Sequence, residues 1–95
     1  MKLLTIIYDA GIDQSIMNVL DKLEVDAWSK FFEIQGSGGA GTKINTPAWP
    51  GINNQLVIGG GEEQLLDVAA AMRSLQEEFK LSPGIFMYLQ EVQEY

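Results

Sequence analysis

The sequence predicts an α+β protein with the element order β-α-β-β-α-β. Three observations support this class. Four short runs are rich in β-branched or aromatic residues, two longer segments carry apolar residues at helical spacing, and a glycine-rich connection separates two similar halves. The length of 95 residues allows one small domain, which we assign to residues 1–95.

The first two elements are a strand and a helix. Residues 3–8 (LLTIIY) are apolar and β-branched, and Asp9 ends the run, as is typical of a buried strand. Either Asp13 or Ser15 is expected as the N-cap of the helix, because both side chains accept hydrogen bonds from a first helical turn. The apolar positions of this helix follow the i, i+3, i+4, i+7 pattern: Ile16, Val19, Leu20 and Leu23.

A second strand is predicted over residues 28–35 (WSKFFEIQ). With regular alternation, Trp28, Phe32 and Ile34 lie on one face of this strand. Residues 36–51 (GSGGAGTKINTPAWPG) are rich in glycine and proline and interrupt the pattern. We expect no secondary structure in this connection between the second and third strands, and connections of such length are often functional.

The second half repeats the order of the first. Residues 52–58 (INNQLVI) predict a strand that ends at the glycines 59–61, and residues 85–92 (IFMYLQEV) predict the last strand. Between them, Glu62 and Glu63 stand where a helix dipole favours negative charge. The apolar positions of this second helix again have helical spacing: Leu65, Val68, Ala69, Met72, Leu75 and Phe79.

These elements predict the ferredoxin-like βαββαβ sandwich, in which both helices cover one face of an antiparallel sheet. The strands, however, are apolar on both faces. In the first strand, Leu3 and Ile7 alternate with Leu4 and Ile6. A large apolar surface usually marks an interface, so we expect an oligomer. The alternative is that loops or the C-terminal tail cover the second face.

Composition excludes several classes of function. Thirteen acidic and six basic residues give a net charge of −7, which argues against binding to nucleic acid. The chain has no His and no Cys, so imidazole and thiolate chemistry are excluded and no metal site is expected. No apolar stretch approaches the roughly 20 residues of a membrane span, and the N-terminal run is too short for a signal peptide. We expect a cytoplasmic protein that does not insert into membranes.

The first half of the glycine-rich connection is a candidate effector site. Glycines let backbone N–H groups approach an anion closely, and the Thr and Lys that end the run could complete a phosphate cradle. Glycine-rich stretches are also typical of flexible hinges, so both interpretations stay open. The candidate effector-binding residues are Gly36, Gly38, Gly39, Gly41, Thr42 and Lys43.

The second half of this connection is a candidate contact for a partner protein. Trp49 lies between two prolines that restrict the backbone, and it is either a packing anchor or a contact residue. The candidate contact residues are Thr46, Trp49, Pro50 and Asn53. No nucleophile stands beside a base, so we predict no enzyme and assign no catalytic residue. An enzyme that uses Tyr8, Asp9 or Tyr88 in a cleft is the remaining alternative.

The element order and this connection resemble the PII-like superfamily of trimeric ferredoxin-like proteins. Gly36-Ser37-Gly38 stands where the long loop of PII signalling proteins begins with Gly-x-Gly. Trp49-Pro50-Gly51 with Asn53 is similar to the expected sequence of uncharacterised PII-like proteins, some of which accompany transporters. The resemblance implies a homotrimer with an effector pocket between subunits near the base of the loop. It also implies a regulatory function, in which loop 36–51 controls docking to a partner such as a membrane transporter.

The same resemblance suggests an adenine nucleotide or another small anion as the effector. PII proteins hold nucleotide phosphates with basic residues that follow the second helix, whereas this chain has only Lys80 there, and Lys43 is the other basic candidate. CutA-like trimers share the topology. A CutA-like structural or metal-tolerance-associated protein without nucleotide binding is therefore the alternative function.

Overall fold

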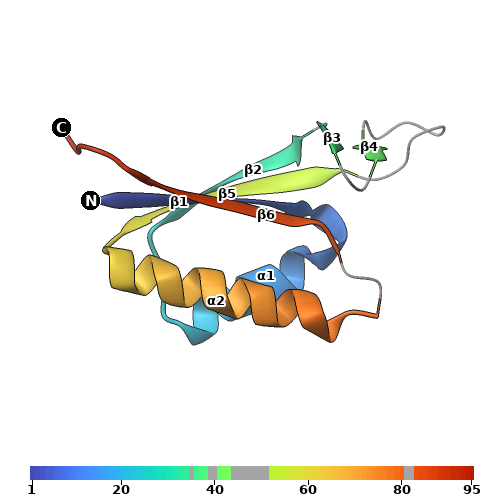
Figure 1. Cartoon of the computed structure of the whole chain (residues 1–95), viewed down its shortest axis with the longest axis horizontal. Coiled ribbons are helices and arrows are strands. Elements are labelled where there is room, and N and C mark those ends of the chain that lie inside the picture. The colour runs from blue at the N-terminus through green and yellow to red at the C-terminus, as the bar shows by residue number, and fades with distance from the viewer. Residues whose placement is uncertain (35, 39–40, 44–51, 81–82) are drawn as a thin grey trace.

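The structure is a computed structural model that describes residues 1–34, 36–38, 41–43, 52–80 and 83–95 (Figure 1). In chain order its elements are β1 (Lys2–Asp9), the 3₁₀ turn η1 (Ala10–Ile12), α1 (Asp13–Lys22), β2 (Trp28–Ile34), β3 (Gly36–Gly38), β4 (Gly41–Lys43), β5 (Asn53–Gly60), α2 (Glu62–Glu78) and β6 (Ile85–Glu91).

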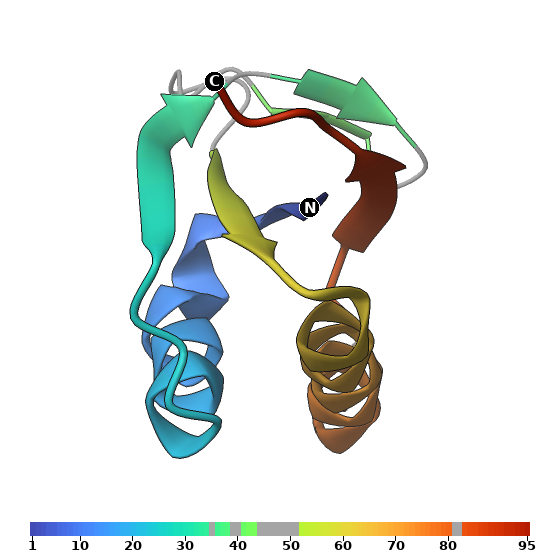
Figure 2. The same ribbon diagram turned by 90° about the vertical axis from the view of Figure 1, so that its left-hand side faces the viewer.

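Four strands form one antiparallel sheet in the order β2-β5-β1-β6, with β1 and β5 in the centre. Both helices lie on the same side of this sheet, next to each other (Figures 1 and 2). The predicted ferredoxin-like βαββαβ sandwich is therefore confirmed. In the part of the chain that the structure describes, two helices form the second layer, and both cover the same face of the sheet (Figure 2).

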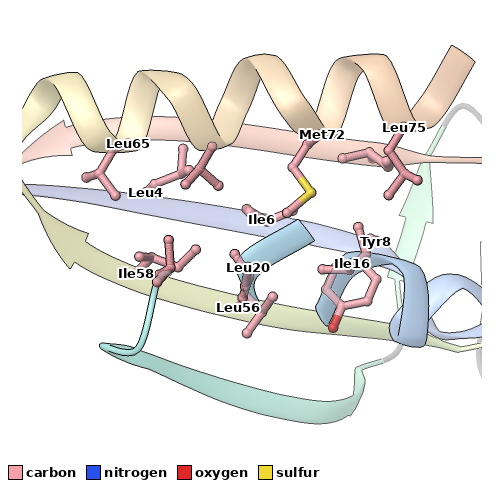
Figure 3. Close-up of a cluster of buried hydrophobic side chains, with 13 residues drawn as sticks. Leu4, Ile6, Tyr8, Ile16, Leu20, Leu56, Ile58, Leu65, Met72 and Leu75 are labelled. Atoms are coloured by element: carbon pink, nitrogen blue, oxygen red, sulfur yellow. The ribbon is translucent and has the colours of Figure 1, made fainter. Parts of the chain in front are cut away.

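The hydrophobic core lies between the sheet and the helices (Figure 3). Leu4 pairs with Ile58 and Ile6 pairs with Leu56 across the central strands, so these side chains share one face. The helices contribute most of the apolar residues predicted from helical spacing, but Leu23 is exposed at the C-cap of α1. Burying an aliphatic side chain of this size stabilises the fold by roughly 1.5–3 kcal/mol. The fully buried members from the helices are Ile16, Leu20, Leu65, Val68 and Met72.

The N-terminus of α1 differs from the prediction. Its N-cap position is Ile12, without a side-chain hydrogen bond, so neither Asp13 nor Ser15 is the cap. Asp9 instead caps the preceding η1 turn, because its Oδ1 accepts a 2.8 Å hydrogen bond from the Gly11 N–H. The carboxylate of Asp13, the first residue of α1, has other partners, which are described below.

The C-terminus of α1 ends in a Schellman motif. Glu24 has a φ of 57° and donates its N–H to the Asp21 carbonyl, while the Val25 N–H reaches the Leu20 carbonyl at 2.9 Å. Leu20 and Val25 are both buried, which is the hydrophobic contact that accompanies this motif. Glutamate seldom adopts a positive φ. The burial of Val25 stabilises this conformation of Glu24 after the helix.

The prediction that Trp28, Phe32 and Ile34 share one face of β2 is wrong for Ile34. Trp28 pairs with Ile58, whose side chain faces the helices, whereas Ile34 pairs with Asn53. The pairing shifts between Phe31 and Ile34, so regular alternation is lost within the strand. A β-bulge is the physical reason for the difference.

The connection predicted to lack secondary structure contains a short hairpin. β3 pairs with β4 in a separate two-stranded sheet, from Gly36 opposite Lys43 to Gly38 opposite Gly41. The prediction of an irregular connection is therefore wrong for these six residues. The end predicted for the third strand is also wrong, because β5 continues through Gly60. Gly59 allows a close approach there, since a Cβ would lie 2.5 Å from Cε of Met1.

The side of the sheet that faces away from the helices is called the open face. Its strands present Phe86 and Tyr88, which are 60% and 43% exposed and form an edge-to-face pair with ring centroids 5.8 Å apart. Phe31 on β2, 54% exposed, lies on the same face because it pairs with Gln55. Further apolar positions of this face are Leu3, Ile7, Ile34 and Val57. Among the described residues, no helix has the length and hydropathy that crossing a membrane requires.

Two adjacent leucines of α2 provide a matched test of the packing. Leu65 is fully buried, so Leu65→Ala is expected to lower the free energy of unfolding by about 2–5 kcal/mol. Leu66 is 53% exposed, so Leu66→Ala is expected to change it by no more than about 0.5 kcal/mol. Urea unfolding of both variants measures the difference. Equal losses would show that α2 packs through a different face.

Candidate functional site

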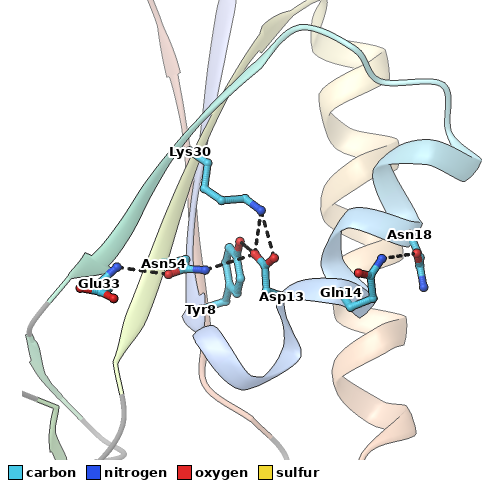
Figure 4. A network of polar contacts seen from close by, with 7 residues as sticks. All are labelled: Tyr8, Asp13, Gln14, Asn18, Lys30, Glu33 and Asn54. Carbon is cyan, nitrogen blue, oxygen red and sulfur yellow. Dashed lines mark hydrogen bonds and ion pairs between the residues drawn. The ribbon is translucent and has the colours of Figure 1, made fainter. Parts of the chain in front are cut away.

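Four polar side chains from four elements meet at the end of the sheet where the segment between β2 and β5 begins and ends (Figure 4). Tyr8 lies near the end of β1 and pairs with Asn54 of β5, so both side chains face the helices. Lys30 of β2 faces the same side because it pairs with Leu56. The η1 turn then brings Asp13 over this end of the sheet. We call Tyr8, Asp13, Lys30 and Asn54 the Asp13 cluster.

Asp13 is the centre of the cluster. Its Oδ1 accepts hydrogen bonds from the Tyr8 hydroxyl at 2.5 Å and from Nδ2 of Asn54 at 3.2 Å. Nζ of Lys30 lies 2.8 Å from Oδ1 and 3.1 Å from Oδ2 of the same carboxylate. One carboxylate therefore connects β1, β2 and β5 to the start of α1.

Lys30 is the most enclosed charge of the cluster, with its side chain only 8% exposed. Its Nζ also lies 5.6 Å from the ring centroid of Trp28 and 5.3 Å from that of Phe32. Aromatic faces at this distance attract a cation. The ion pair and the two rings compensate the loss of water around Lys30, so this cation is engaged within its own chain.

The cluster shifts the pKa values of two of its members. Burial raises the pKa of Tyr8 far above its ordinary value of 10.0, and its hydrogen bond to Asp13 raises the pKa further. Partial burial alone would raise the pKa of Asp13, but the hydrogen bonds from Lys30, Tyr8 and Asn54 outweigh it. The pKa of Asp13 is therefore below its ordinary value of 3.8.

These protonation states favour an anchoring role over a catalytic one. At neutral pH Tyr8 is a protonated donor and Asp13 is an ionised acceptor, and their hydrogen bonds satisfy each other. The three residues of the enzymatic alternative do not meet. Asp9 caps η1, and Tyr88 lies on the open face, opposite to the side on which Tyr8 is buried.

Hydrogen bonds from the cluster and from η1 hold the two ends of the segment between β2 and β5. Oδ1 of Asn54 accepts a 3.3 Å hydrogen bond from the N–H of Glu33, one residue before the end of β2. The Ala10 N–H donates to the carbonyl of Ile52, directly before β5, at 2.9 Å. One end of the segment is thus bonded to Asn54 of the cluster, and the other end is bonded to Ala10 of η1.

The predicted effector residues fall in and around the hairpin. Gly36 and Gly38 lie in β3, and Gly41, Thr42 and Lys43 lie in β4, for which the backbone pairing is described. The remaining predicted residues lie outside the described part of the chain, except Asn53, which begins β5 and pairs with Asp9 and Ile34. Those outside it are Gly39, Thr46, Trp49 and Pro50.

Two side chains of α2 bind the backbone where β6 begins. One of them is a basic residue that the sequence did not indicate as a contact. Nη1 of Arg73 donates a 2.8 Å hydrogen bond to the carbonyl of Ile85, and Nε2 of Gln76 donates to that of Pro83 at 2.7 Å. Arg73 lies within α2, whereas the basic residues of PII proteins are expected after this helix. Among the described residues, no group of three acidic side chains is placed to hold a metal ion.

The lowered pKa of Asp13 predicts a specific loss of stability in acid. The carboxylate stabilises the fold above the pKa of the unfolded chain, and this contribution is lost as the pH falls through the lower pKa of the folded state. Urea unfolding at about pH 7 and about pH 3 should show a drop in stability that is much smaller in Asp13→Asn. Glu77→Gln, which removes an exposed carboxylate of α2, is the matched control. An unchanged drop in Asp13→Asn would contradict the assignment.

Known proteins resemble this chain in structure but not detectably in sequence. No protein-family model matches the sequence, and no curated protein matches it significantly. Solved structures do match. CPII from Thiomonas intermedia K12, a nitrogen regulatory PII-like protein bound to ADP, AMP and bicarbonate, superposes with a TM-score of 0.71 at 17% identity, covering 96% of this chain and 86% of CPII.

Two further structures give the same result. A putative PII-like signalling protein from Thermus thermophilus has a TM-score of 0.64 at 21% identity, over 94% of this chain and 83% of that protein. The apo form of CPII has a TM-score of 0.63 at 16% identity, over 96% of this chain and 89% of CPII. The resemblance inferred from the sequence is confirmed at the level of the fold: this chain has the ferredoxin-like fold of the PII-like proteins.

Proposed function

We propose that this protein is a PII-like regulator that assembles as a homotrimer, senses a small effector between subunits and controls a partner protein. The observation that carries the proposal is the open face of the sheet. It presents the exposed aromatic pair Phe86 and Tyr88 on a fold shared with nitrogen regulatory PII-like proteins. In this proposal the protein acts in the cytoplasm and is not an enzyme.

The open face supports assembly because a second copy of the chain can cover it. Thr5 lies there between its pairing partners Val57 and Tyr88 and is only 3% exposed. Water is therefore largely excluded from the centre of the face. Phe31 and Phe86 at its sides remain more than half exposed. Large aromatic side chains around a dry centre are typical of the well-packed core of a protein interface.

The effector of this proposal is an adenine nucleotide or another small anion. CPII binds ADP, AMP and bicarbonate, which is the reason to test these compounds first. Lys30 is paired with Asp13, so we assign the anion to the glycine-rich run instead, with Gly36, Gly38, Gly39, Gly41, Thr42 and Lys43 as its contact residues. In the sequence these residues follow β2, the end of which is bonded to Asn54 of the Asp13 cluster.

The segment 36–51 is also the proposed contact with the regulated partner. Thr46, Trp49, Pro50 and Asn53 are the contact residues of this proposal, and a membrane transporter is the class of partner that the PII-like resemblance suggests. A tryptophan held between prolines loses little conformational freedom on binding, which suits a contact residue.

A second candidate function is a CutA-like trimer without an effector. It is favoured by the ion pair between Asp13 and Lys30, because the nearly buried Lys30 already has a counter-ion. Such a trimer would share the interface and lack the response to nucleotides or bicarbonate, so ligand binding separates the two candidates.

A charge placed on the open face tests the assembly. Tyr88→Asp is expected to convert the trimer to monomers, because an unpaired carboxylate in an apolar interface is costly. Leu66→Asp, on an exposed position of α2, is the matched control and should remain trimeric. Light scattering coupled to size-exclusion chromatography measures the mass of each. A wild-type monomer would overturn the proposed assembly.

A thermal-shift screen tests the effector. ADP, AMP and bicarbonate are each compared with adenosine, which has the base but no phosphate. A ligand that binds the folded state at about 100-fold its Kd stabilises it by about 2.7 kcal/mol, which raises the unfolding midpoint by several degrees. Lys43→Ala should reduce the response to ADP. No response from an intact trimer to any of these compounds would favour the CutA-like function.

A further inference from the structure

The last part of β2 contains one residue more than the strand it pairs with. Phe31 lies opposite Gln55 and Ile34 lies opposite Asn53, so three steps along β2 match two steps along β5. Glu33, inside this bulge, has a φ of 57°, a conformation that is unfavourable for a residue with a side chain. The bulge is the final paired part of β2 before the chain leaves the sheet.

The bulge can be compared with the regular pairing that would replace it. Without the extra residue, Glu33 would lie opposite Asn53, and Ile34 would move past the end of the pairing. Because side chains alternate along a strand, every residue after the bulge would then change faces. Regular pairing would also relieve the positive φ of Glu33. The bulged register therefore needs an interaction that the regular register lacks.

Asn54 supplies this interaction. Its Oδ1 accepts the N–H of Glu33, a backbone donor inside the bulge. Its Nδ2 donates to Oδ1 of Asp13, which fixes the orientation of the amide. Asn54 is 3% exposed, so water does not readily replace either contact. Asp13 is in turn held by Tyr8 and Lys30.

We propose that Asp13 and Asn54 form a register lock: they hold β2 in its bulged register and so determine which faces Glu33 and Ile34 present where the chain leaves the sheet. Both are positioning residues, because they act on the backbone of Glu33. The lock does not depend on the proposed function. Its use as a regulatory element does, since an effector or partner that draws the Asp13 carboxylate away would release the bulge and redirect the start of segment 36–51.

Cross-strand cysteine pairs measure the register directly, because the chain has no native cysteine. Residues directly opposite each other in an antiparallel pair are close enough for a disulfide. In the bulged register the pair Ile34→Cys with Asn53→Cys is opposed. In the regular register the pair Glu33→Cys with Asn53→Cys is opposed. Non-reducing gels separate these links within one chain from links between chains.

With the lock intact, the Ile34/Asn53 pair is expected to oxidise faster than the Glu33/Asn53 pair. Adding Asn54→Ala should shift the ratio of the two rates by about threefold to tenfold toward the Glu33/Asn53 pair, the change expected for one lost hydrogen bond. Gln55→Ala, one position further along β5, is the matched control and should leave the ratio unchanged.

An unchanged ratio in folded Asn54→Ala would overturn the lock, and so would a preference for the Glu33/Asn53 pair without that substitution. If Asn54→Ala does not fold, Asp13→Asn decides the question by the same ratio, because it keeps the size of the side chain. All measurements are made without ligand, so failure of the lock is distinguishable from failure of the proposed effector binding.

Discussion

Two helices can cover only one face of a four-stranded sheet, and the organisation of this protein follows from that constraint. The face toward α1 and α2 contains the hydrophobic core, with Ile6 and Leu56 at its centre. The open face carries apolar side chains as well, and Phe86 and Tyr88 remain exposed on it. In the described part of the chain, both helices lie against the opposite face (Figures 1 and 2). In the proposed assembly the open face is the contact with another copy of the chain, because large exposed apolar surfaces usually mark interfaces.

The Asp13 cluster connects this scaffold to the segment proposed to carry the function. A carboxylate with three donors satisfies Lys30, which would otherwise be a nearly buried charge without a counter-ion. The same carboxylate orients Asn54, whose amide holds the bulge at Glu33. The same polar contacts therefore connect the strands of the sheet and hold the end of β2, where the segment begins. In the proposed function, an effector or partner that binds at one end of this chain of contacts changes the other end.

Local patterns predicted the scaffold well. The apolar spacing from Leu65 to Leu75 indicated α2, and the runs at residues 3–8 and 85–92 indicated two strands, because burial on one face leaves a periodic record in the sequence. The Asp13 cluster left no such record. Asp13 looked like a helix cap, but its partners Lys30 and Asn54 are 17 and 41 residues away along the chain. The β3–β4 pairing was missed because backbone hydrogen bonds between glycine-rich strands need no apolar alternation. Arg73 was missed because its reach to Ile85 depends on how α2 packs.

The central proposal joins assembly through the open face to effector binding between subunits, and native mass spectrometry of the unmodified chain with ADP tests both together. The proposal predicts a species of three times the chain mass that takes up as many as three nucleotides, with little nucleotide on the monomer, because the site needs two subunits. A species that stays monomeric at every protein concentration, or a monomer that binds ADP as well as the assembly does, would contradict it.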